Sequence, residues 1–289
     1  MSSLVLKGKP VANSIKKITE EMIAADELKP TLAVIIVGHD PASEYYVENI
    51  AKQGEKLGIA VILKKFESID PAGLIHEIKQ CNENDNISAI MIQKPLPKNI
   101  DEKVINSIIS PDKDVDGLNP LNAGNLYLGQ ECFIPCTAES VLEIIKFYGI
   151  QTQSKHIVVV GRSNVIGKPI ANLFLHKSPT GDATVTVCHS KTKNIENYTK
   201  QADILVTAVG RPNMIKKEMI KENCVIIDAG INEISKENDK NTFVGDVDYQ
   251  DCLDKCEAIT PVPGGVGSVT TTVLLHHVVR SAKKIKKKE

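Results

Sequence analysis

The sequence predicts an α/β protein in which two domains flank a cleft. Aliphatic runs rich in β-branched residues alternate with helical stretches along most of the chain, a pattern typical of parallel strands joined by right-handed crossovers. The chain has 289 residues, 42% of them hydrophobic, which is enough for two domains of ordinary size. A proline-rich loop follows one predicted strand, at the edge where open α/β sheets bind ligands.

The first half of the chain reads as a helix followed by a β-α-β-α-β unit. From Val11 to Leu28, apolar residues recur at helical spacing. Ser43 closes a turn, and we expect it to cap the next helix. The unit comprises a strand at 32–37, a helix at 44–57, a strand at 61–63, a helix at 72–81 and a strand at 87–92.

Two loops follow this unit. The segment Gln93–Pro97 cannot continue a central strand, because its two prolines lack N–H donors. We therefore expect a loop at the carboxyl end of the strand, where a ligand would bind. Residues 111–117, PDKDVDG, form a second, acidic loop.

Residues 156–169, HIVVVGRSNVIGKP, are the stretch around which the second half is organised. Four β-branched residues predict a strand buried on both faces, and a helix begins near Gly167. A strand, a glycine-containing turn and a helix point backbone N–H groups at a phosphate. The dinucleotide fingerprint is incomplete: Gly161 takes the first place, Ser163 replaces the second glycine, and Gly167 comes one residue late. The alternative is an ordinary strand-to-helix turn.

The end of the next strand, at 183–188, bears on the choice of cofactor. His189 and Ser190 begin a polar segment where an NAD site usually carries a carboxylate for the ribose 2′-hydroxyl. Donors and cations, with Arg162 in the preceding turn, suit a 2′-phosphate instead and favour NADP. The alternative is a solvated polar strand end.

The remaining pattern predicts a Rossmann-like second domain. Its further elements are a helix at 138–147, strands at 203–208 and 224–228, a loop at 260–267 and a helix at 271–288. We expect this last helix to pack back on the first domain. The domains are therefore placed at 1–122, together with 270–289, and at 123–269.

Composition excludes several classes of function. A net charge of −1 gives no basis for a nucleic-acid partner, and the lysine run at 283–288 reads as a solvated helix end. No apolar run is long enough to span a membrane. Seven scattered cysteines without an apolar leader predict reduced thiols in a soluble, cytoplasmic protein. The pairs Cys132/Cys136 and Cys252/Cys256 have zinc-like spacing, but nothing else in the sequence supports a metal.

Nine segments together resemble one known family, the methylenetetrahydrofolate dehydrogenase/methenyltetrahydrofolate cyclohydrolases. They are VGHDPASEYYV (37–47), IQKPLP (92–97), PDKDVDGLNPLNAG (111–124), FIPCTAES (133–140), VVVGRSNVIGKP (158–169), ATVTVCHSKT (183–192), VIIDAGIN (225–232), VGDVD (244–248) and TPVPGGVG (260–267). The resemblance spans nearly the whole chain. It implies that the first domain binds folate and carries catalysis, that the second binds NADP, and that a homodimer forms through the cofactor domain.

The resemblance also implies roles for single residues of the folate side. Tyr46 resembles the tyrosine that packs on the folate rings, although a core tyrosine is the alternative. Asp116 resembles the carboxylate that binds the pterin, although an aspartate in a loop is often only a turn residue. Gln93 resembles the glutamine beside the reacting carbon. Further substrate contacts are implied at Pro263, Gly264 and Gly265.

On the cofactor side, Arg162 and Ser190 resemble the residues at the 2′-phosphate, and Ser163 resembles a phosphate contact. The remaining implied cofactor contacts are Gly161, Gly167, His189 and Ile231.

The sequence departs from the family pattern where hydrolysis is concerned. The family has a catalytic lysine four residues after the stacking tyrosine, and this chain has Ile50. Lys94 replaces the usual leucine after the glutamine, and Ser268-Val269 replaces the usual Pro-Met. Lys94 comes from a loop near Gln93 and is the credible substitute for the missing lysine.

We therefore expect an NADP-dependent methylenetetrahydrofolate dehydrogenase of one-carbon metabolism with weak or absent cyclohydrolase activity. Three alternatives stay open. The first is a fully bifunctional enzyme that uses Lys94, and the second is a folate- and dinucleotide-binding protein without turnover. The third, another two-domain dehydrogenase, would not share the folate-side loops.

Overall fold

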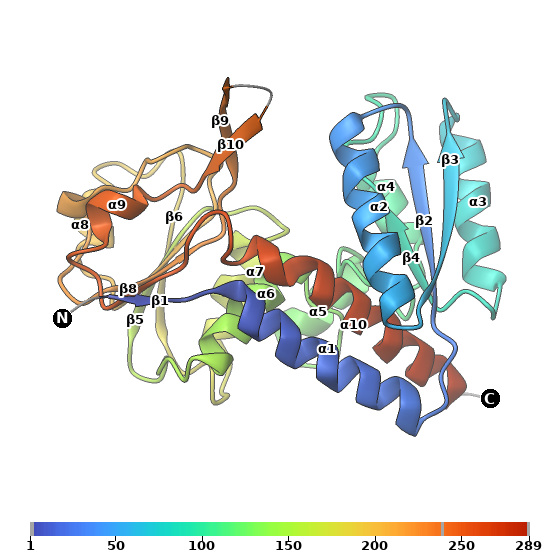
Figure 1. Ribbon diagram of the computed structural model, residues 1–289, viewed down its shortest axis with the longest axis horizontal. Helices are drawn as coiled ribbons and strands as arrows, with labels where there is room; N and C mark the ends of the chain where they lie inside the picture. The colour runs from blue at the N-terminus through green and yellow to red at the C-terminus, as the bar shows by residue number, and fades with distance from the viewer. Residues whose placement is uncertain (1–2, 238–239, 288–289) are drawn as a thin grey trace. The chain divides into compact units, whose positions relative to one another are not determined.

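The computed structural model describes residues 3–237 and 240–287 and divides into two compact units (Figure 1). The three-stranded unit comprises Ser14–Cys136 and Thr271–Glu289, and the six-stranded unit comprises Met1–Asn13 and Thr137–Thr270. Each has a parallel sheet, which confirms the predicted two-domain α/β class. The first residues of the chain belong to the six-stranded unit because β1 (Leu4–Val5) pairs with β11 (Ala258–Ile259) in its sheet.

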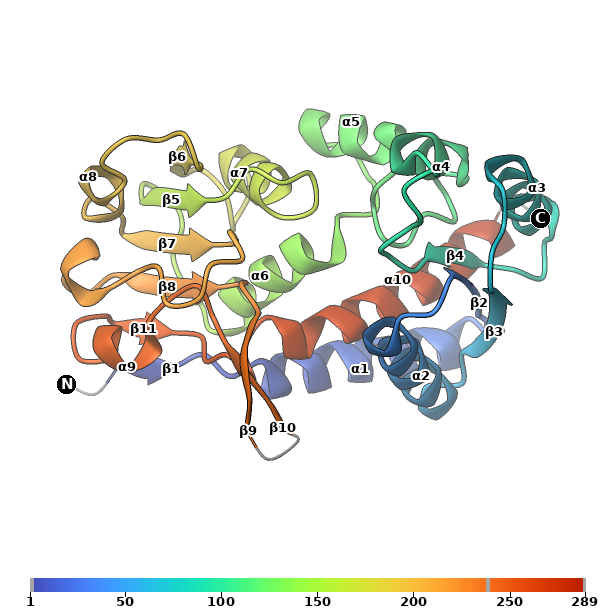
Figure 2. The ribbon, with the colours of Figure 1, turned by 90° about the horizontal axis from the view of Figure 1, so that it is seen from above.

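The sheet of the three-stranded unit has the order β3-β2-β4. Its strands are β2 (Thr31–Val37), β3 (Ala60–Phe66) and β4 (Ala89–Ile92). Its helices include α2 (Pro41–Lys56), α3 (Pro71–Glu83), α4 (Glu102–Ile108) and α5 (Pro120–Leu128). Figures 1 and 2 show α2 and α3 on opposite faces of the sheet. With both faces covered, six of the seven residues of β2 are buried.

The sequence pattern did not predict the short helices of this unit. The helices α4 and α5 have seven and nine residues, too few to establish a helical period. Each instead begins at a capping side chain: Asp101 accepts from Lys103 N–H, and Asn119 accepts from Leu121 N–H.

The expected cap of α2 was wrong. The N-cap is Asp40, whose carboxylate accepts hydrogen bonds from the N–H and the hydroxyl of Ser43. The helix starts at Pro41, since proline fits the first turn, where no N–H partner is needed. The oxygen of the Ser43 hydroxyl remains able to accept a further hydrogen bond.

The six-stranded sheet has the order β1-β11-β8-β7-β5-β6. Its central strands are β5 (His156–Val160), β6 (Thr184–Cys188), β7 (Ile204–Thr207) and β8 (Val225–Asp228). Helices α6 (Cys136–Phe147), α7 (Gly167–Leu175), α8 (Glu196–Thr199) and α9 (Tyr249–Cys252) and a 3-10 turn at Lys217–Met219 connect the strands. An antiparallel hairpin of β9 (Asn232–Glu237) and β10 (Lys240–Val244) follows β8.

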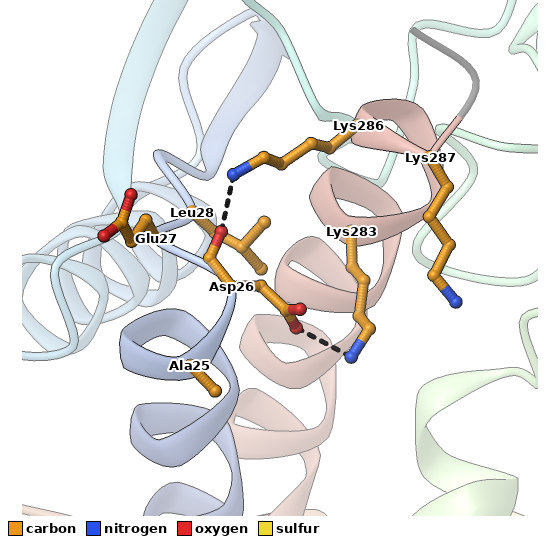
Figure 3. Close-up of a pocket in the computed structure, with 7 residues that line it drawn as sticks. All are labelled: Ala25, Asp26, Glu27, Leu28, Lys283, Lys286 and Lys287. Carbon is orange, nitrogen blue, oxygen red and sulfur yellow. Dashed lines mark hydrogen bonds and ion pairs between the residues drawn. The ribbon is translucent and has the colours of Figure 1, made fainter.

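Two long helices complete the chain, α1 (Gly8–Ala25) and α10 (Gly267–Lys286). Their ends are joined at Asp26, whose carboxylate lies 2.7 Å from Lys283 Nζ and whose carbonyl accepts from Lys286 Nζ at 2.7 Å (Figure 3). These lysines of the charged run therefore fasten α10 to the end of α1. Lys288 and Glu289, the end of the predicted final helix, lie outside the described residues.

None of the helices within residues 3–237 and 240–287 has both the length and the apolar composition that a membrane span requires.

Candidate active site

Gln93 and Lys94 follow β4 directly, at the carboxyl end of the three-stranded sheet. Gln93 Nε2 donates to Ser43 Oγ at 3.2 Å and to Lys94 O at 2.8 Å. Ser43 Oγ lies 3.1 Å from Lys94 O, and its single hydrogen is donated to Asp40 Oδ2 at 2.6 Å. Because Ser43 Oγ accepts from Gln93, the first turn of α2 fixes this loop. Gln93 Oε1 is buried and has no hydrogen-bond partner among the described residues. A buried acceptor in this state suits a ligand that supplies an N–H or O–H donor.

Asp116 belongs to the acidic loop and is half-buried. Burial raises its pKa to about 6, and the neighbouring carboxylate of Asp114 adds to the rise. Lys94 and His277 act in the opposite direction and lower the pKa. Lys94 also lies 3.0 Å from the carboxylate of Glu102. The structure thus brings Lys94 into the electrostatic environment of Asp116, as the sequence could not show.

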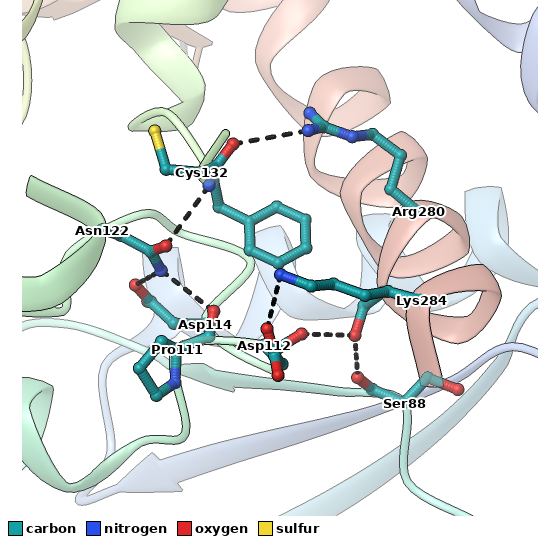
Figure 4. A network of polar contacts seen from close by, with 10 residues as sticks. Ser88, Pro111, Asp112, Asp114, Asn122, Cys132, Arg280 and Lys284 are labelled. Carbon is teal, nitrogen blue, oxygen red and sulfur yellow. Dashed lines mark hydrogen bonds and ion pairs between the residues drawn. The ribbon is translucent and has the colours of Figure 1, made fainter. Parts of the chain in front are cut away.

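Hydrogen bonds from the Asn122 amide to Asp114 and Pro111 help to hold the acidic loop in shape (Figure 4). Asp114 is buried and accepts from the N–H groups of Leu118 and Asn119, at 3.2 and 2.7 Å. The Asn122 amide donates to the same carboxylate at 2.8 Å and to Pro111 O at 3.0 Å. Asp114 is therefore the turn residue of this loop.

Tyr46 lies on α2 and is half-buried. Burial raises its pKa, and the nearby Asp116 and Cys136 raise it further, while a hydrogen bond with Thr271 acts against the rise. The phenol is thus neutral and lies beside Asp116. A flat, partly exposed ring next to a carboxylate can hold a planar ring system that carries N–H donors.

The two remaining lysines of α2 do not reach this site. Ile50 is completely buried on the same face as Tyr46. Lys52 points to solvent, with 72% of its side chain exposed, and pairs with Glu48 at 3.7 Å. Lys56 is also exposed.

In the six-stranded unit, glycines shape the turn between β5 and α7. Gly161 has a φ of +132°, and a Cβ there would lie 2.4 Å from Ala208 O. A Cβ at Gly167 would lie 2.2 Å from Gly161 O. Only glycine fits either place, because the backbone itself occupies the space. Ser163 Oγ accepts from the N–H groups of Ile166 and Gly167, at 3.1 and 3.4 Å, and so orders the start of α7.

A pocket of about 240 Å³ opens beside this turn. It is lined by Val160, Gly161, Arg162, His189, Ser190, Ile195, Ala208, Val209, Arg211 and Met214. His189 Nδ1 accepts from Lys191 N–H at 3.2 Å. Apolar walls with two arginines at the rim suit an adenosine that bears a phosphate. Arg211 was missed from the sequence, because no local motif connects the loop after β7 with the turn after β5.

A buried aspartate holds that second loop in place. Asp246 accepts from the N–H groups of Val209, Gly210 and Arg211, at 2.6, 3.3 and 2.8 Å. The amide of Asn232 donates to the same carboxylate at 3.0 Å. Asp246 thus fixes the backbone that carries two residues of the pocket wall.

The other expected site residues lie elsewhere. Ile231 is 65% exposed and does not line the pocket. Pro263 and Gly264 are exposed, and Gly265 is buried, in the loop that precedes α10. This loop belongs to the six-stranded unit, whereas Asp116 belongs to the other, and its backbone is held by Gly8 N–H, which donates to Gly264 O at 2.8 Å. Within the described parts of the chain, no group of three or more His, Cys, Asp or Glu side chains could hold a metal.

Comparisons with known proteins match both parts of the chain to one family. Residues 6–116 match the family model "Tetrahydrofolate dehydrogenase/cyclohydrolase, catalytic domain", and residues 135–286 match the corresponding "NAD(P)-binding domain". The bifunctional protein FolD of Bacillus cytotoxicus is 46% identical over 288 residues, covering 98% of each chain.

Two solved structures that are similar to this chain belong to the same kind of enzyme. The bifunctional dehydrogenase/cyclohydrolase FolD from Campylobacter jejuni has a TM-score of 0.92 at 39% identity, covering 98% of this chain and 99% of that one. The FolD of Trypanosoma brucei, solved with NADP cofactor and an inhibitor, has a TM-score of 0.91 at 33% identity, covering 98% of each chain.

Proposed function

We propose a function on the premise that the chain belongs to the tetrahydrofolate dehydrogenase/cyclohydrolase family, as both family models and its full-length relatives show. The protein oxidises 5,10-methylenetetrahydrofolate to 5,10-methenyltetrahydrofolate with NADP in one-carbon metabolism. Two observations on the three-stranded unit support this proposal. Tyr46 lies beside Asp116, whose pKa is lowered by Lys94, the residue after Gln93. Gln93 Oε1 is buried and lacks a partner among the described residues.

Each side chain of the cluster has a role toward a reduced folate. The Asp116 carboxylate accepts two N–H bonds from the aminopyrimidinone of the pterin, which fixes both its position and its orientation. Tyr46 stacks on the folate rings. Gln93 lies beside the reacting carbon, where the contacts to Ser43 and Lys94 O hold its amide. Pro263, Gly264 and Gly265 complete the substrate contacts in this proposal.

The cofactor binds in the six-stranded unit, where Arg162, Arg211 and Ser190 line one pocket. These groups suit the 2′-phosphate of NADP, and no carboxylate lines the pocket to accept from a 2′-hydroxyl. Gly161, Ser163 and Gly167 form the turn that accommodates the diphosphate at the start of α7. His189 lines the pocket. Ile231, in the loop after β8, is proposed as a further contact to the cofactor.

The chemistry asks little of the protein beyond positioning. One C–H bond of the methylene carbon breaks, and both its electrons leave with the hydrogen to the nicotinamide of NADP. The lone pairs of the folate nitrogens stabilise the resulting methenyl cation, so that no general base is needed. The chain therefore has to bind both partners, orient the donor carbon and exclude water.

An absorbance assay tests this function. Methenyltetrahydrofolate formation is followed after methylenetetrahydrofolate is mixed with the protein and either NADP or NAD. Enzymatic formation with a preference for NADP is expected. Binding of both ligands without turnover would instead identify a binding protein.

The second candidate function is the complete bifunctional activity, in which the methenyl compound is also hydrolysed to 10-formyltetrahydrofolate. The observation that favours it is the ammonium of Lys94, which is close enough to Asp116 to lower the pKa of that carboxyl. We propose that hydrolysis is nevertheless weak, because Lys94 is already paired with Glu102 at 3.0 Å and Ile50 has no proton to transfer.

We further propose a homodimer through the six-stranded unit. Within the described residues, β6 pairs with β5 on one side and with no other strand. Val187 of β6 is 40% exposed, so an apolar strand edge is available for a second copy. Sedimentation should give a dimer mass, and Val187→Lys should shift it toward the monomer; a monomeric wild type would contradict the proposal. Nucleic acid and membranes are not among the proposed partners.

We also propose that the protein acts in the cytoplasm. Six of the seven cysteines are buried, which suits a chain whose thiols stay reduced in that compartment.

A further inference from the structure

One face of α10 holds the acidic loop that carries Asp116. His277, Ser281 and Lys284 succeed one another at helical spacing, so they share a face. Ser281 Oγ donates to Asp112 O at 2.6 Å, and Lys284 Nζ lies 2.6 Å from Asp112 Oδ1 (Figure 4). Both contacts fix the beginning of the loop, four residues before Asp116.

His277 makes the contact nearest to Asp116. Its Nδ1 lies 2.8 Å from Val115 O, the carbonyl of the peptide bond between Val115 and Asp116. A carbonyl oxygen can only accept, so Nδ1 carries the hydrogen and donates it. The imidazole is completely buried and packs against the Phe133 ring, with 5.2 Å between the ring centroids. It has no room to turn away from this peptide.

The thiol of Cys136 approaches the same peptide from the start of α6. Its Sγ lies 3.3 Å from Val115 O, 3.8 Å from His277 Nδ1 and 3.9 Å from Asp116 Oδ1. Because Nδ1–H is directed at Val115 O, the S–H can donate to that oxygen or to the Asp116 carboxylate. Imidazole and thiol therefore converge on the backbone and the side chain of Asp116.

We propose that His277 is a positioning residue for Asp116, which fixes the Val115–Asp116 peptide so that the carboxylate is directed at the pterin. This inference rests on the proposed function, because it takes Asp116 as the folate ligand. His277 itself stays behind the site and acts through the peptide and the thiol. A small rotation of that peptide would displace both carboxylate oxygens from the two N–H groups they are to accept.

The imidazole also influences the charge of Asp116. The groups that face this carboxyl are Asp114, Lys94, His277, Cys136 and Tyr46. Of these, Asp114 raises its pKa, whereas Lys94, His277 and the Cys136 thiol lower it. Loss of the imidazole should therefore raise the pKa of Asp116, and binding that needs the carboxylate should weaken at a higher pH than in the wild type.

The test compares His277→Leu, which removes the donor, with His277→Asn, whose amide can donate to Val115 O without an ionisable ring. His276→Leu is the matched control, because His276 is the adjacent imidazole of α10 and contacts Thr19 Oγ1 at 3.0 Å. For each variant, kcat and the KM values for methylenetetrahydrofolate and NADP are measured between pH 5 and 9.

We expect His277→Leu to raise the folate KM roughly tenfold, the effect of one lost hydrogen bond, and to leave the NADP KM unchanged. His277→Asn should restore the folate KM at pH 8. Both variants should move the acidic limb of kcat/KM for folate to higher pH, and His276→Leu should move neither quantity.

An unchanged folate KM and acidic limb in His277→Leu would overturn the inference, as would equal effects of His276→Leu. Should His277→Leu not fold, the acidic limb of His277→Asn decides: an upward shift supports the inference, and an unchanged limb rejects it. A wild type without turnover would reject the proposed function instead, so the two failures are distinguishable.

Discussion

Ile50 lies one helical turn beyond Tyr46 on the inner face of α2, and its side chain is completely buried. The family resemblance implies a catalytic lysine at this place. Here the position is filled by an aliphatic side chain, while Lys52 points to solvent. Position 50 thus contributes to the core of the three-stranded unit, and its side chain has no proton to transfer.

We therefore expect wild-type protein to accumulate methenyltetrahydrofolate, which then decays no faster than in buffer alone. Ile50→Lys should speed that decay, because burial lowers the pKa of an introduced lysine and lets it move protons near neutral pH. Ile50→Met is the control, since it has similar length without an amine. The rate of hydrolysis by wild type, Ile50→Lys and Ile50→Met is measured as the decay of methenyltetrahydrofolate absorbance.

Lys94→Leu supplies the second arm of this test. If the wild type hydrolyses the methenyl compound at an enzymatic rate and Lys94→Leu abolishes it, Lys94 has replaced the missing lysine. If hydrolysis is enzymatic and unaffected by Lys94→Leu, our interpretation of both positions is wrong.

Cofactor preference should depend on Arg162. Arg162→Ala should raise the KM for NADP roughly ten- to a hundredfold, because a charge-assisted hydrogen bond to a phosphate contributes about 1.5–3 kcal/mol. The KM for NAD, which lacks this phosphate, should change little. Initial rates with both cofactors give the comparison, and equal effects on NADP and NAD would remove Arg162 from the 2′-phosphate site. Arg211→Ala shows whether the second arginine of the pocket shares the role.

The parallel sheets could be predicted because buried strands and amphipathic helices leave strong local patterns. The strand predicted from the four β-branched residues after His156 is β5 (His156–Val160). The two-residue strand β1 carries no such pattern, and its membership of the six-stranded sheet depends on pairing with β11, more than 250 residues away in sequence. Such pairing is a tertiary property, which local propensity does not encode.

The candidate site likewise contains residues that local sequence patterns predicted and residues that they did not. Tyr46, Gln93 and Asp116 were predicted because they lie in segments that resemble the family's. His277, Cys136 and Asp246 were missed, because they act through backbone groups of other segments. Ser43 was misassigned for a related reason: a serine in an Asp-Pro-Ala-Ser turn fits the N-cap, but the carboxylate of Asp40 accepts hydrogen bonds from both its N–H and its hydroxyl.

Asp246 gives a prediction about the cofactor loop. In Asp246→Asn, one carboxylate oxygen becomes an NH₂ group that faces backbone N–H donors instead of accepting from them. We expect the NADP KM to rise about tenfold, the folate KM to stay constant and the protein to lose about 1–3 kcal/mol of stability. The control is Asp248→Asn, because Asp248 pairs with Lys216 and does not contact the loop. Steady-state kinetics and urea unfolding measure both variants.

Asp116 should bind folate without affecting the cofactor. Asp116→Ala is expected to abolish folate binding and to leave NADP binding intact, because the two sites belong to different units. Calorimetric titration with each ligand measures this. Normal folate binding by Asp116→Ala would refute the role of the carboxylate.

The Asp116 carboxylate should also lower the stability of the folded protein. Burial raises its pKa from 3.8 to about 6, so between these values the native state binds more protons than the unfolded chain, and stability falls as pH rises. Asp116→Asn mimics the protonated form and should be about 1–3 kcal/mol more stable than wild type at pH 8. The difference should vanish near pH 4, where the wild-type carboxyl is protonated in the native state.

Asp40→Asn is the control of opposite sign, because hydrogen bonds from Ser43 lower the pKa of Asp40. The stabilisation by Asp40 therefore exists at high pH and is lost on acidification. Urea unfolding at pH 8, 6 and 4 gives the free energy of unfolding of the three proteins. If the stability difference between Asp116→Asn and wild type does not depend on pH, the pKa of the Asp116 carboxyl is not raised.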